Sequence, residues 1–216
     1  VFKGNAFLCS EPQSKAHSSY LNGVNEYNYN PDKANKLLDA AGWKKGSDGI
    51  REKDGAKFIM HVKCSSTSST DQLVIPIMKE NYKKIGIDVE PEFTDLNTLL
   101  GKMKNKDFEA YLMGTSLGSD AISSNLAANF KTDATNNYDG YSNPQVDDLI
   151  NQATNEQDLS KRTKIEQKIY KIINEDLPFV FTYQPETIWA CNLRISGLKF
   201  LPYKYYSYST YKAEIK

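Results

Sequence analysis

Histidine is scarce in this sequence: among 216 residues only His17 and His61 occur. A serine or cysteine nucleophile needs a neighbouring base that a third group orients. The sequence contains no GxSxG elbow, P-loop, GxGxxG or HExxH motif. The paired acids Asp147-Asp148 and Glu175-Asp176 fall in predicted helices, where they are typical of solvated faces or caps. We therefore expect no enzyme, no cofactor and no metal site.

Cysteine is also rare, and the numbers of basic and acidic residues are equal. Cys9, Cys64 and Cys191 are odd in number, far apart and without metal-binding spacing, so they predict isolated thiols and no disulfide framework. Lys plus Arg number 27 and Asp plus Glu number 27, for a net charge of zero. Proteins that bind nucleic acid usually carry a basic excess, so that partner is not expected.

Long apolar runs are missing as well. No stretch approaches the roughly 20 apolar residues of a membrane span, and no signal peptide is recognisable. The sequence opens on Val1-Phe2-Lys3 without a methionine, which fits either a mature product or a piece of a longer protein. Tyrosine, by contrast, is abundant, with 14 residues. Its flat apolar body and polar tip suit wet recognition surfaces.

The middle of the chain alternates between predicted strands and helices. Asn30 caps a helix that Pro31 opens and Gly42 ends, and a small hairpin is predicted around residues 50–53. Strands are then predicted at 57–64, 87–93 and 108–114, with helices from about 69 to 85 and from 96 to 103. Pro76 inside the first of these two helices allows a kink or a late start. This alternation favours βαβ units and an α/β fold with a mainly parallel sheet.

The second half of the chain is predicted to be mainly helical. A weak helix spans 122–130, a stronger one 144–154, and a long one follows Asp158 to about Glu175. Two strands, 178–183 and 187–191, are predicted on either side of Gln184-Pro185-Glu186, and a short strand at 197–202. Residues 1–29 show turn signals and no periodicity.

Two strands of the predicted sheet end in runs of small hydroxyl residues. Right-handed crossovers would place both strand ends on one rim of the sheet, which is where open α/β sheets usually bind ligands. Tyrosines further along could add donors and flat apolar faces for a polar organic ligand. The candidate ligand-binding residues are Ser65, Ser66, Thr67, Thr115, Ser116, Gly118, Ser119, Asp120, Tyr138, Tyr141 and Tyr183.

Six phrases in order carry a resemblance to a known family. They are Tyr29-Asn-Pro-Asp-Lys-Ala-Asn-Lys-Leu-Leu-Asp-Ala-Ala-Gly-Trp43, Asp48-Gly-Ile-Arg-Glu-Lys-Asp-Gly55, Ile85-Gly-Ile-Asp-Val89, Lys106-Asp-Phe-Glu-Ala-Tyr111, Gly140-Tyr-Ser-Asn-Pro-Gln-Val-Asp-Asp-Leu-Ile150 and Ile173-Asn-Glu-Asp-Leu-Pro-Phe179. Over roughly residues 25–200 the chain resembles the C-terminal lobe of dipeptide- and oligopeptide-binding proteins of ABC transporters.

The resemblance implies a type II periplasmic-binding-protein-like lobe, with a mixed, mainly parallel sheet flanked by helices. Residues 1–216 would form a single lobe of a fragment whose N-terminal lobe precedes Val1, and the tail at 203–216 would return toward that missing lobe. The implied partners are a peptide or small polar solute and the permease subunits of the transporter. The implied location is the extracellular face of a bacterial membrane, through a lipid-anchored parent, or the periplasm.

The chain departs from the family at the residues that hold a peptide's amino terminus. After the strand at 108–114 the family typically has Gly-Trp and then an Asp a few positions on. Here Thr115 stands in place of the Trp, Gly118 falls near the Asp position, and Asp120 follows two residues later. Tyr141 and Tyr183 fall where the family often presents aromatics to the cleft. The alternatives are a sensor or adaptor lobe that does not transport, or a binder of a sugar or a metal chelate.

Overall fold

The computed structural model describes residues 1–115, 125–188, 190–199 and 211–215. Within the chain, two compact units can be distinguished. Unit 1 comprises Val1 and residues 27–115, and unit 2 comprises residues 2–26 and 116–216. The prediction of a single lobe over 1–216 stays a prediction. Ser116, Gly118, Ser119 and Asp120, and the tail at 203–210, lie outside the described residues.

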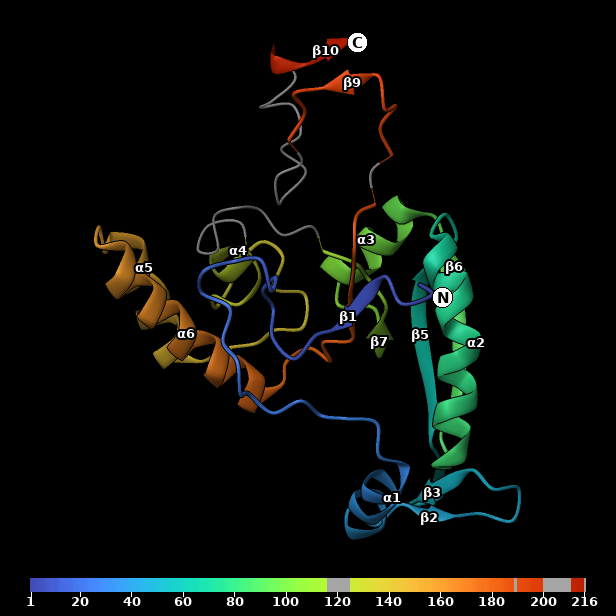
Figure 1. Ribbon diagram of the computed structural model, residues 1–216. Coiled ribbons are helices and arrows are strands. Elements are labelled where there is room, and N and C mark those ends of the chain that lie inside the picture. The colour runs from blue at the N-terminus through green and yellow to red at the C-terminus, as the bar shows by residue number, and fades with distance from the viewer. Residues whose placement is uncertain (116–124, 189, 200–210, 216) are drawn as a thin grey trace. The chain divides into compact units, whose positions relative to one another are not determined.

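A three-stranded parallel sheet organises unit 1 (Figure 1). The strand order is β6-β5-β7, and Ile59 pairs with Asp88 while Val62 pairs with Ala110. The strands are β5 (Ile59–Ser65), β6 (Asp88–Thr94) and β7 (Ala110–Tyr111), connected by α2 (Ser69–Lys84) and α3 (Leu96–Lys104). The predicted strand–helix alternation and the parallel sheet are confirmed, although β7 is shorter than the predicted strand at 108–114.

The core of unit 1 lies between the sheet and α2. Alternate residues of β5, Val62 and Cys64, are buried against Val89 of β6 and Ile75 of α2. Alternation places them on one face of the strand, as a half-covered sheet requires. Helix α2 begins at Ser69 and continues through Pro76, so the late start that the proline allowed does not occur.

The remaining elements of unit 1 are one helix and a small antiparallel sheet. Asn30 caps α1 (Pro31–Ala40), with its side chain accepting from the Lys33 N–H at 2.8 Å. The chain then forms β2 (Lys44–Lys45), β3 (Arg51–Lys53) and β4 (Ala56–Lys57), paired in the order β2-β3-β4. The predicted hairpin is therefore present, with a third short strand added.

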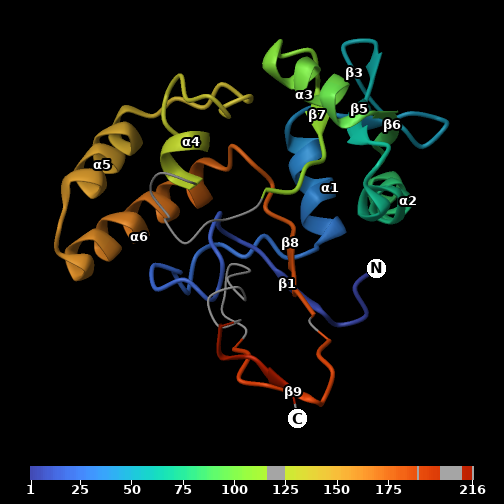
Figure 2. The ribbon, with the colours of Figure 1, turned by 90° about the horizontal axis from the view of Figure 1, so that it is seen from above.

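Helices dominate unit 2. They are α4 (Ala127–Asn129), α5 (Pro144–Asn155) and α6 (Leu159–Asp176). Helices α5 and α6 lie side by side (Figure 2). Their apolar faces meet in a core that contains Val146, Ile150, Ile169 and Ile173, all at most 1% exposed. Both predicted long helices are confirmed, whereas the weak helix predicted at 122–130 is reduced in the described residues to the short α4.

In the described part of unit 2, two short antiparallel ribbons accompany the helices, and they correct two of the predictions. Strand β1 (Ala6–Leu8) pairs with β8 (Tyr183–Pro185), and β9 (Ile195–Ser196) pairs with β10 (Glu214–Ile215). The prediction that Gln184-Pro185-Glu186 joins two strands was wrong, because Gln184 and Pro185 lie within β8. Residues 1–29 were predicted to be irregular, yet Ala6–Leu8 form a strand.

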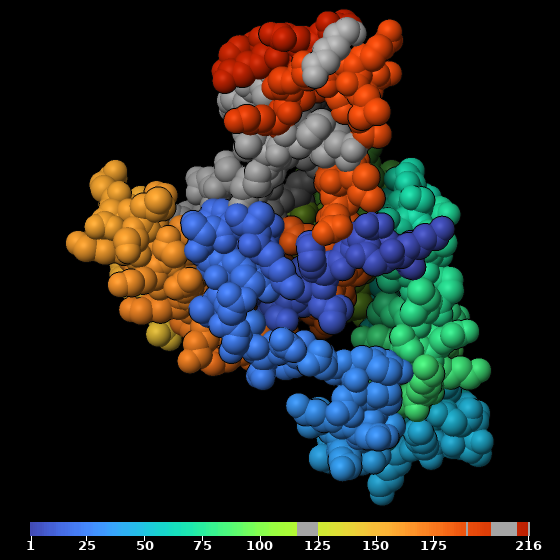
Figure 3. Space-filling view, viewed as in Figure 1, coloured from blue at the N-terminus to red at the C-terminus, as the bar shows by residue number. Residues whose placement is uncertain are grey.

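Residues 10–25, called here the N-terminal segment, pack against α6 (Figure 3). The Asn174 amide donates to the carbonyls of Ser10 at 2.6 Å and Asn25 at 2.9 Å, and its oxygen accepts from the Asn25 N–H at 3.0 Å. The Gln13 amide donates to the Tyr170 hydroxyl at 3.1 Å. One buried asparagine thus fastens both ends of the segment to the same helix.

Candidate ligand-binding site

The chain reversal after β5 is held by its own hydrogen bonds. Asp71, near the start of α2, accepts from the Ser65 N–H at 3.2 Å and from the Ser68 hydroxyl at 2.7 Å. Ser68 caps the helix by accepting from the Asp71 N–H at 3.1 Å. The Ser66 N–H donates to the Thr94 carbonyl at 2.8 Å. A polar turn at a sheet edge is therefore preorganised, with most of its donors and acceptors already paired.

This turn forms one wall of a hollow in unit 1. The hollow has a volume of about 240 Å³ and lies at the carboxyl ends of β5 and β7. Its polar side is made by the turn and its apolar side by α3 and the residues that follow β7. The lining residues are Ser65, Thr67, Ser68, Asp71, Leu96, Leu99, Leu112, Met113 and Gly114.

The size of the hollow limits what it can hold. Sites that enclose a drug-sized ligand usually measure 300–1,000 Å³, so about 240 Å³ fits only part of such a ligand. Gly114 contributes open space, since a Cβ added there would meet no atom within 4 Å. The geometry is therefore that of a subsite for one ligand group.

Among the predicted residues of unit 1, the structure brings some to this hollow. Ser65 and Thr67 line it, with their hydroxyl oxygens 3.0 Å apart. Ser66 and Thr115 are exposed and are not among the lining residues. Ser116, Gly118, Ser119 and Asp120 lie outside the described residues. The role of all of these residues in ligand binding stays a prediction.

Several lining residues were missed by the sequence reasoning. Asp71 carries a signal that could have found it, because Ser68-x-x-Asp71 is a helix-capping pattern directly after a strand. Leu96, Leu99, Leu112 and Met113 carry no such signal, because an apolar residue at the end of an element looks like any other core residue.

A buried thiol lies at the end of β5, next to the turn. Cys64 is 0% exposed, and burial, reinforced by the negative charge of Asp71, raises its pKa to about 11. This thiol therefore stays protonated at neutral pH and behaves as a small apolar side chain. All three cysteines are free, as predicted. In the part of the chain that the structure describes, no three His, Cys, Asp or Glu residues are arranged to hold a metal ion.

The three predicted tyrosines belong to unit 2 and have structural partners there. The Tyr141 hydroxyl donates to Asp176 at 2.6 Å, and its ring lies edge-on to Phe130. Burial, together with the Asp176 carboxylate, raises the pKa of Tyr141. Tyr138 donates to the Asn136 side chain at 3.4 Å, and Tyr183 lies in β8 with its ring 4.8 Å from that of Phe2.

Tyr141→Phe should lower the free energy of unfolding by about 1–2 kcal/mol, because it removes a short hydrogen bond to a carboxylate. Urea denaturation followed by circular dichroism would measure the change. Tyr138→Phe is the matched control, since it removes a hydroxyl whose bond is long at 3.4 Å, and should change stability by less than about 0.5 kcal/mol. Equal losses in the two variants would contradict a special role for the Tyr141–Asp176 bond.

None of the helices in the described ranges combines the length and apolar character needed to cross a bilayer.

Comparison with known proteins identifies a family that the chain matches. Residues 1–137 match the family model described as bacterial extracellular solute-binding proteins, family 5 Middle. The chain is 30% identical over 207 residues to the oligopeptide-binding protein AppA of Bacillus subtilis (strain 168), covering 94% of this chain and 38% of that protein. It is 28% identical over 133 residues to the nickel-binding protein NikA of Staphylococcus aureus, covering 60% of this chain and 26% of that protein.

Solved structures agree on the fold. The structure of AppA from Bacillus subtilis in complex with a nonapeptide matches with a TM-score of 0.80 at 28% identity, over 99% of this chain and 43% of that one. NikZ from Campylobacter jejuni in complex with Ni(L-His) matches with a TM-score of 0.76 at 20% identity, over 98% of this chain and 44% of that one. The predicted type II periplasmic-binding-protein-like α/β fold is thereby confirmed.

The chain spans less than half the length of these relatives. The family model covers more than half of the chain, however, and runs through β5, α2, β6, α3 and β7, the elements that build the hollow. The chain therefore belongs to the bacterial extracellular solute-binding proteins of family 5.

Proposed function

We propose that this chain is one lobe of the solute-binding component of an ABC importer, and that the whole protein captures a peptide and delivers it to the permease subunits. The observation that carries the proposal is the 30% identity to the oligopeptide-binding protein AppA over 94% of the chain. The hollow at the strand ends supports it, because about 240 Å³ suits one group of a longer ligand.

The proposed mechanism is capture by closure. A ligand that contacts two lobes favours the state in which they close on it, since that state gains the extra contacts. The N-terminal lobe of the same parent chain would supply the remaining contacts, and the tail at 203–216 would return toward it. The parent would act outside the cytoplasmic membrane, either lipid-anchored on the extracellular face or free in a periplasm.

The test compares the full-length parent protein with the 216-residue chain by isothermal titration calorimetry. We expect the parent to bind peptides of three to nine residues at least tenfold more tightly than nickel chelates or oligosaccharides. The 216-residue chain should bind the same peptides at least a hundredfold more weakly than the parent, because it offers part of the contacts. Preference of the parent for a chelate or a sugar would overturn the peptide assignment. Tight peptide binding by the 216-residue chain would overturn the proposal that two lobes share the ligand contacts.

A further inference from the structure

The charges around the hollow in unit 1 are one-sided. Among the described residues that line it, only Asp71 is ionisable, and none is a lysine, arginine or histidine. Two lysines of unit 1 are already engaged: Lys63 of β5 pairs with Glu92, and Lys102 of α3 lies 2.6 Å from the other oxygen of that carboxylate. Of the side chains that the structure describes at the hollow, an anionic ligand group would meet one carboxylate and no cation.

The polar wall also offers a charged ligand group few unpaired hydrogen-bond donors or acceptors. Both oxygens of Asp71 accept hydrogen bonds from the turn, and the Ser65 and Thr67 hydroxyls bond to each other. Polar groups that are already paired can be covered by an apolar group at low cost, whereas a charge brought into such a site loses its hydration without compensation.

The opposite wall offers apolar surface. Leu112 and Met113 are half-buried, and Leu96 at the start of α3 remains 48% exposed, whereas Leu99 is fully buried and adds no accessible surface. An apolar ligand group that covers Leu96 and its neighbours would remove this surface from water, which is favourable in proportion to its area.

We propose that this hollow is a specificity pocket that accepts one uncharged, apolar side chain of a bound peptide and rejects an acidic side chain at that position. The proposal rests on the peptide-binding function proposed above. The volume of the hollow, about 240 Å³, fits one side chain and excludes a whole ligand.

The test uses the full-length parent protein and a set of pentapeptides in which one position at a time carries Leu or Glu. Calorimetry should find one position at which Glu weakens binding at least thirtyfold relative to Leu. In the parent carrying Leu96→Lys, which places a cation at the pocket, the penalty for Glu at that position should shrink at least tenfold.

Leu73→Lys is the matched control. Leu73 lies on α2 of the same unit, is 56% exposed, and does not line the hollow, so this variant should keep the wild-type ratio between Leu and Glu peptides. If the parent binds peptides but its affinities for Leu and Glu peptides differ by less than threefold at every position, the pocket proposal alone is overturned. The same holds if Leu96→Lys leaves the ratio between Leu and Glu peptides unchanged. A parent that binds none of the peptides would overturn the proposed function and the pocket with it.

Discussion

Replacing Arg51 with methionine should lower the free energy of unfolding of unit 1 by about 3–5 kcal/mol. The Arg51 side chain is 1% exposed, although Arg51 lies on β3, a short strand of a surface hairpin. Its guanidinium and Nε donate to acceptors from three different parts of unit 1. The acceptors are the Asp39 carboxylate at 2.6 Å, the Asn35 side-chain oxygen at 2.7 Å, the Ile85 carbonyl at 2.7 Å and the Trp43 carbonyl.

The expected loss follows from the groups that methionine would leave unpaired. Asp39 is 65% exposed and can return to water. The carbonyls of Ile85 and Trp43 and the Asn35 oxygen lie around the buried guanidinium, and each unsatisfied buried acceptor costs about 1–3 kcal/mol. The surroundings are also tightly packed: a Cβ added to Gly86, which has a φ of +80°, would lie 2.8 Å from Arg51 Cγ. Little room is left for water to replace the lost donors.

Urea unfolding monitored by Trp43 fluorescence would measure this effect, with Trp189, the other tryptophan of the sequence, replaced by Phe in every variant. Trp43 reports on unit 1 because its ring packs at a tilt against Phe58 of the same unit, with ring centroids 4.4 Å apart. Arg51→Lys should recover less than half of the loss, since an ammonium cannot reproduce the planar fork of donors. Arg194→Met, at an exposed arginine, is the control and should change stability by less than about 0.5 kcal/mol. A loss for Arg51→Met as small as that of the control would show that the cluster contributes nothing net.

The Arg51 cluster shows where sequence reasoning about this chain succeeds and where it stops. Helix α1 and its asparagine cap, and the order β5-α2-β6-α3-β7, could be predicted because each depends on residues close together in the chain. The pattern around Arg51 predicts only a small hairpin, because nothing within a few residues reveals that the Arg51 side chain reaches the turn after α2. The pairing of β1 with β8 was missed for the same reason, since three-residue strands carry no period and these two come from opposite ends of the sequence.

The site shows the same division. The hydroxyl-rich end of β5 and its place beside the end of β7 follow from parallel βαβ order. The order of the strands and helices does not predict that the apolar wall and the carboxylate of Asp71 line the hollow, because the hollow depends on where α3 packs. The tyrosines were chosen by residue type and, for Tyr141 and Tyr183, by their positions in the family resemblance. In the structure the Tyr141 hydroxyl donates to Asp176.

Glu11 should make unit 2 lose stability as the pH rises from 5 to 8. This residue of the N-terminal segment is 2% exposed; one carboxylate oxygen accepts from the Leu21 N–H at 2.8 Å, and the other is buried without a hydrogen-bond partner. Burial raises the pKa of Glu11 from 4.5 to about 7, and the Leu21 bond offsets only part of that rise. The titratable groups that interact with it are Cys9, Tyr20 and Tyr170.

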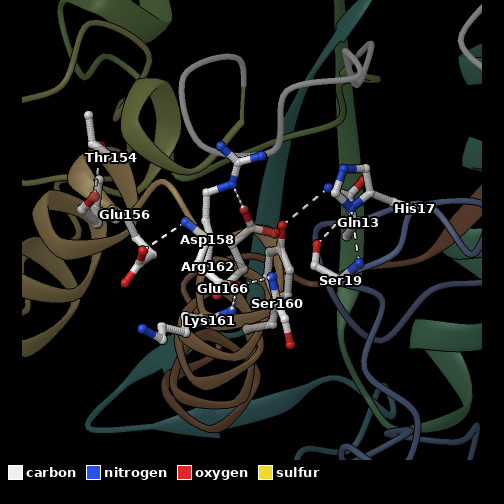
Figure 4. A network of polar contacts seen from close by, with 12 residues as sticks. Gln13, His17, Ser19, Thr154, Glu156, Asp158, Ser160, Lys161, Arg162 and Glu166 are labelled. Carbon is white, nitrogen blue, oxygen red and sulfur yellow. Dashed lines mark hydrogen bonds and ion pairs between the residues drawn. The ribbon is translucent and has the colours of Figure 1, made fainter.

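The sign follows from linkage between protonation and folding. A carboxyl whose pKa is higher in the folded state contributes its stability fully below the unfolded pKa and loses it as the pH rises through the folded pKa. With values of 4.5 and about 7, the loss is complete somewhat above pH 7 and amounts to about 3 kcal/mol at most. Figure 4 shows a network of polar contacts that includes His17 and the Arg162–Glu166 pair. The quantity to measure is the difference in stability between the wild type and a Glu11 variant, because that difference isolates the contribution of the Glu11 carboxyl.

Glu11→Gln should abolish this part of the pH dependence, because the amide keeps an acceptor for Leu21 and never ionises. At pH 8 the variant should be more stable than the wild type by about 2–3 kcal/mol, and at pH 5 by less than about 1 kcal/mol. Hydrogen exchange by mass spectrometry gives a local readout: after correction for intrinsic rates, exchange in residues 10–25 should rise with pH in the wild type and stay level in Glu11→Gln. Glu186→Gln, at an exposed glutamate of the same unit, should behave as the wild type. Parallel stability curves for Glu11→Gln and the wild type would show that the Glu11 carboxylate is hydrated in solution, because only access to water removes the free-energy cost of its charge.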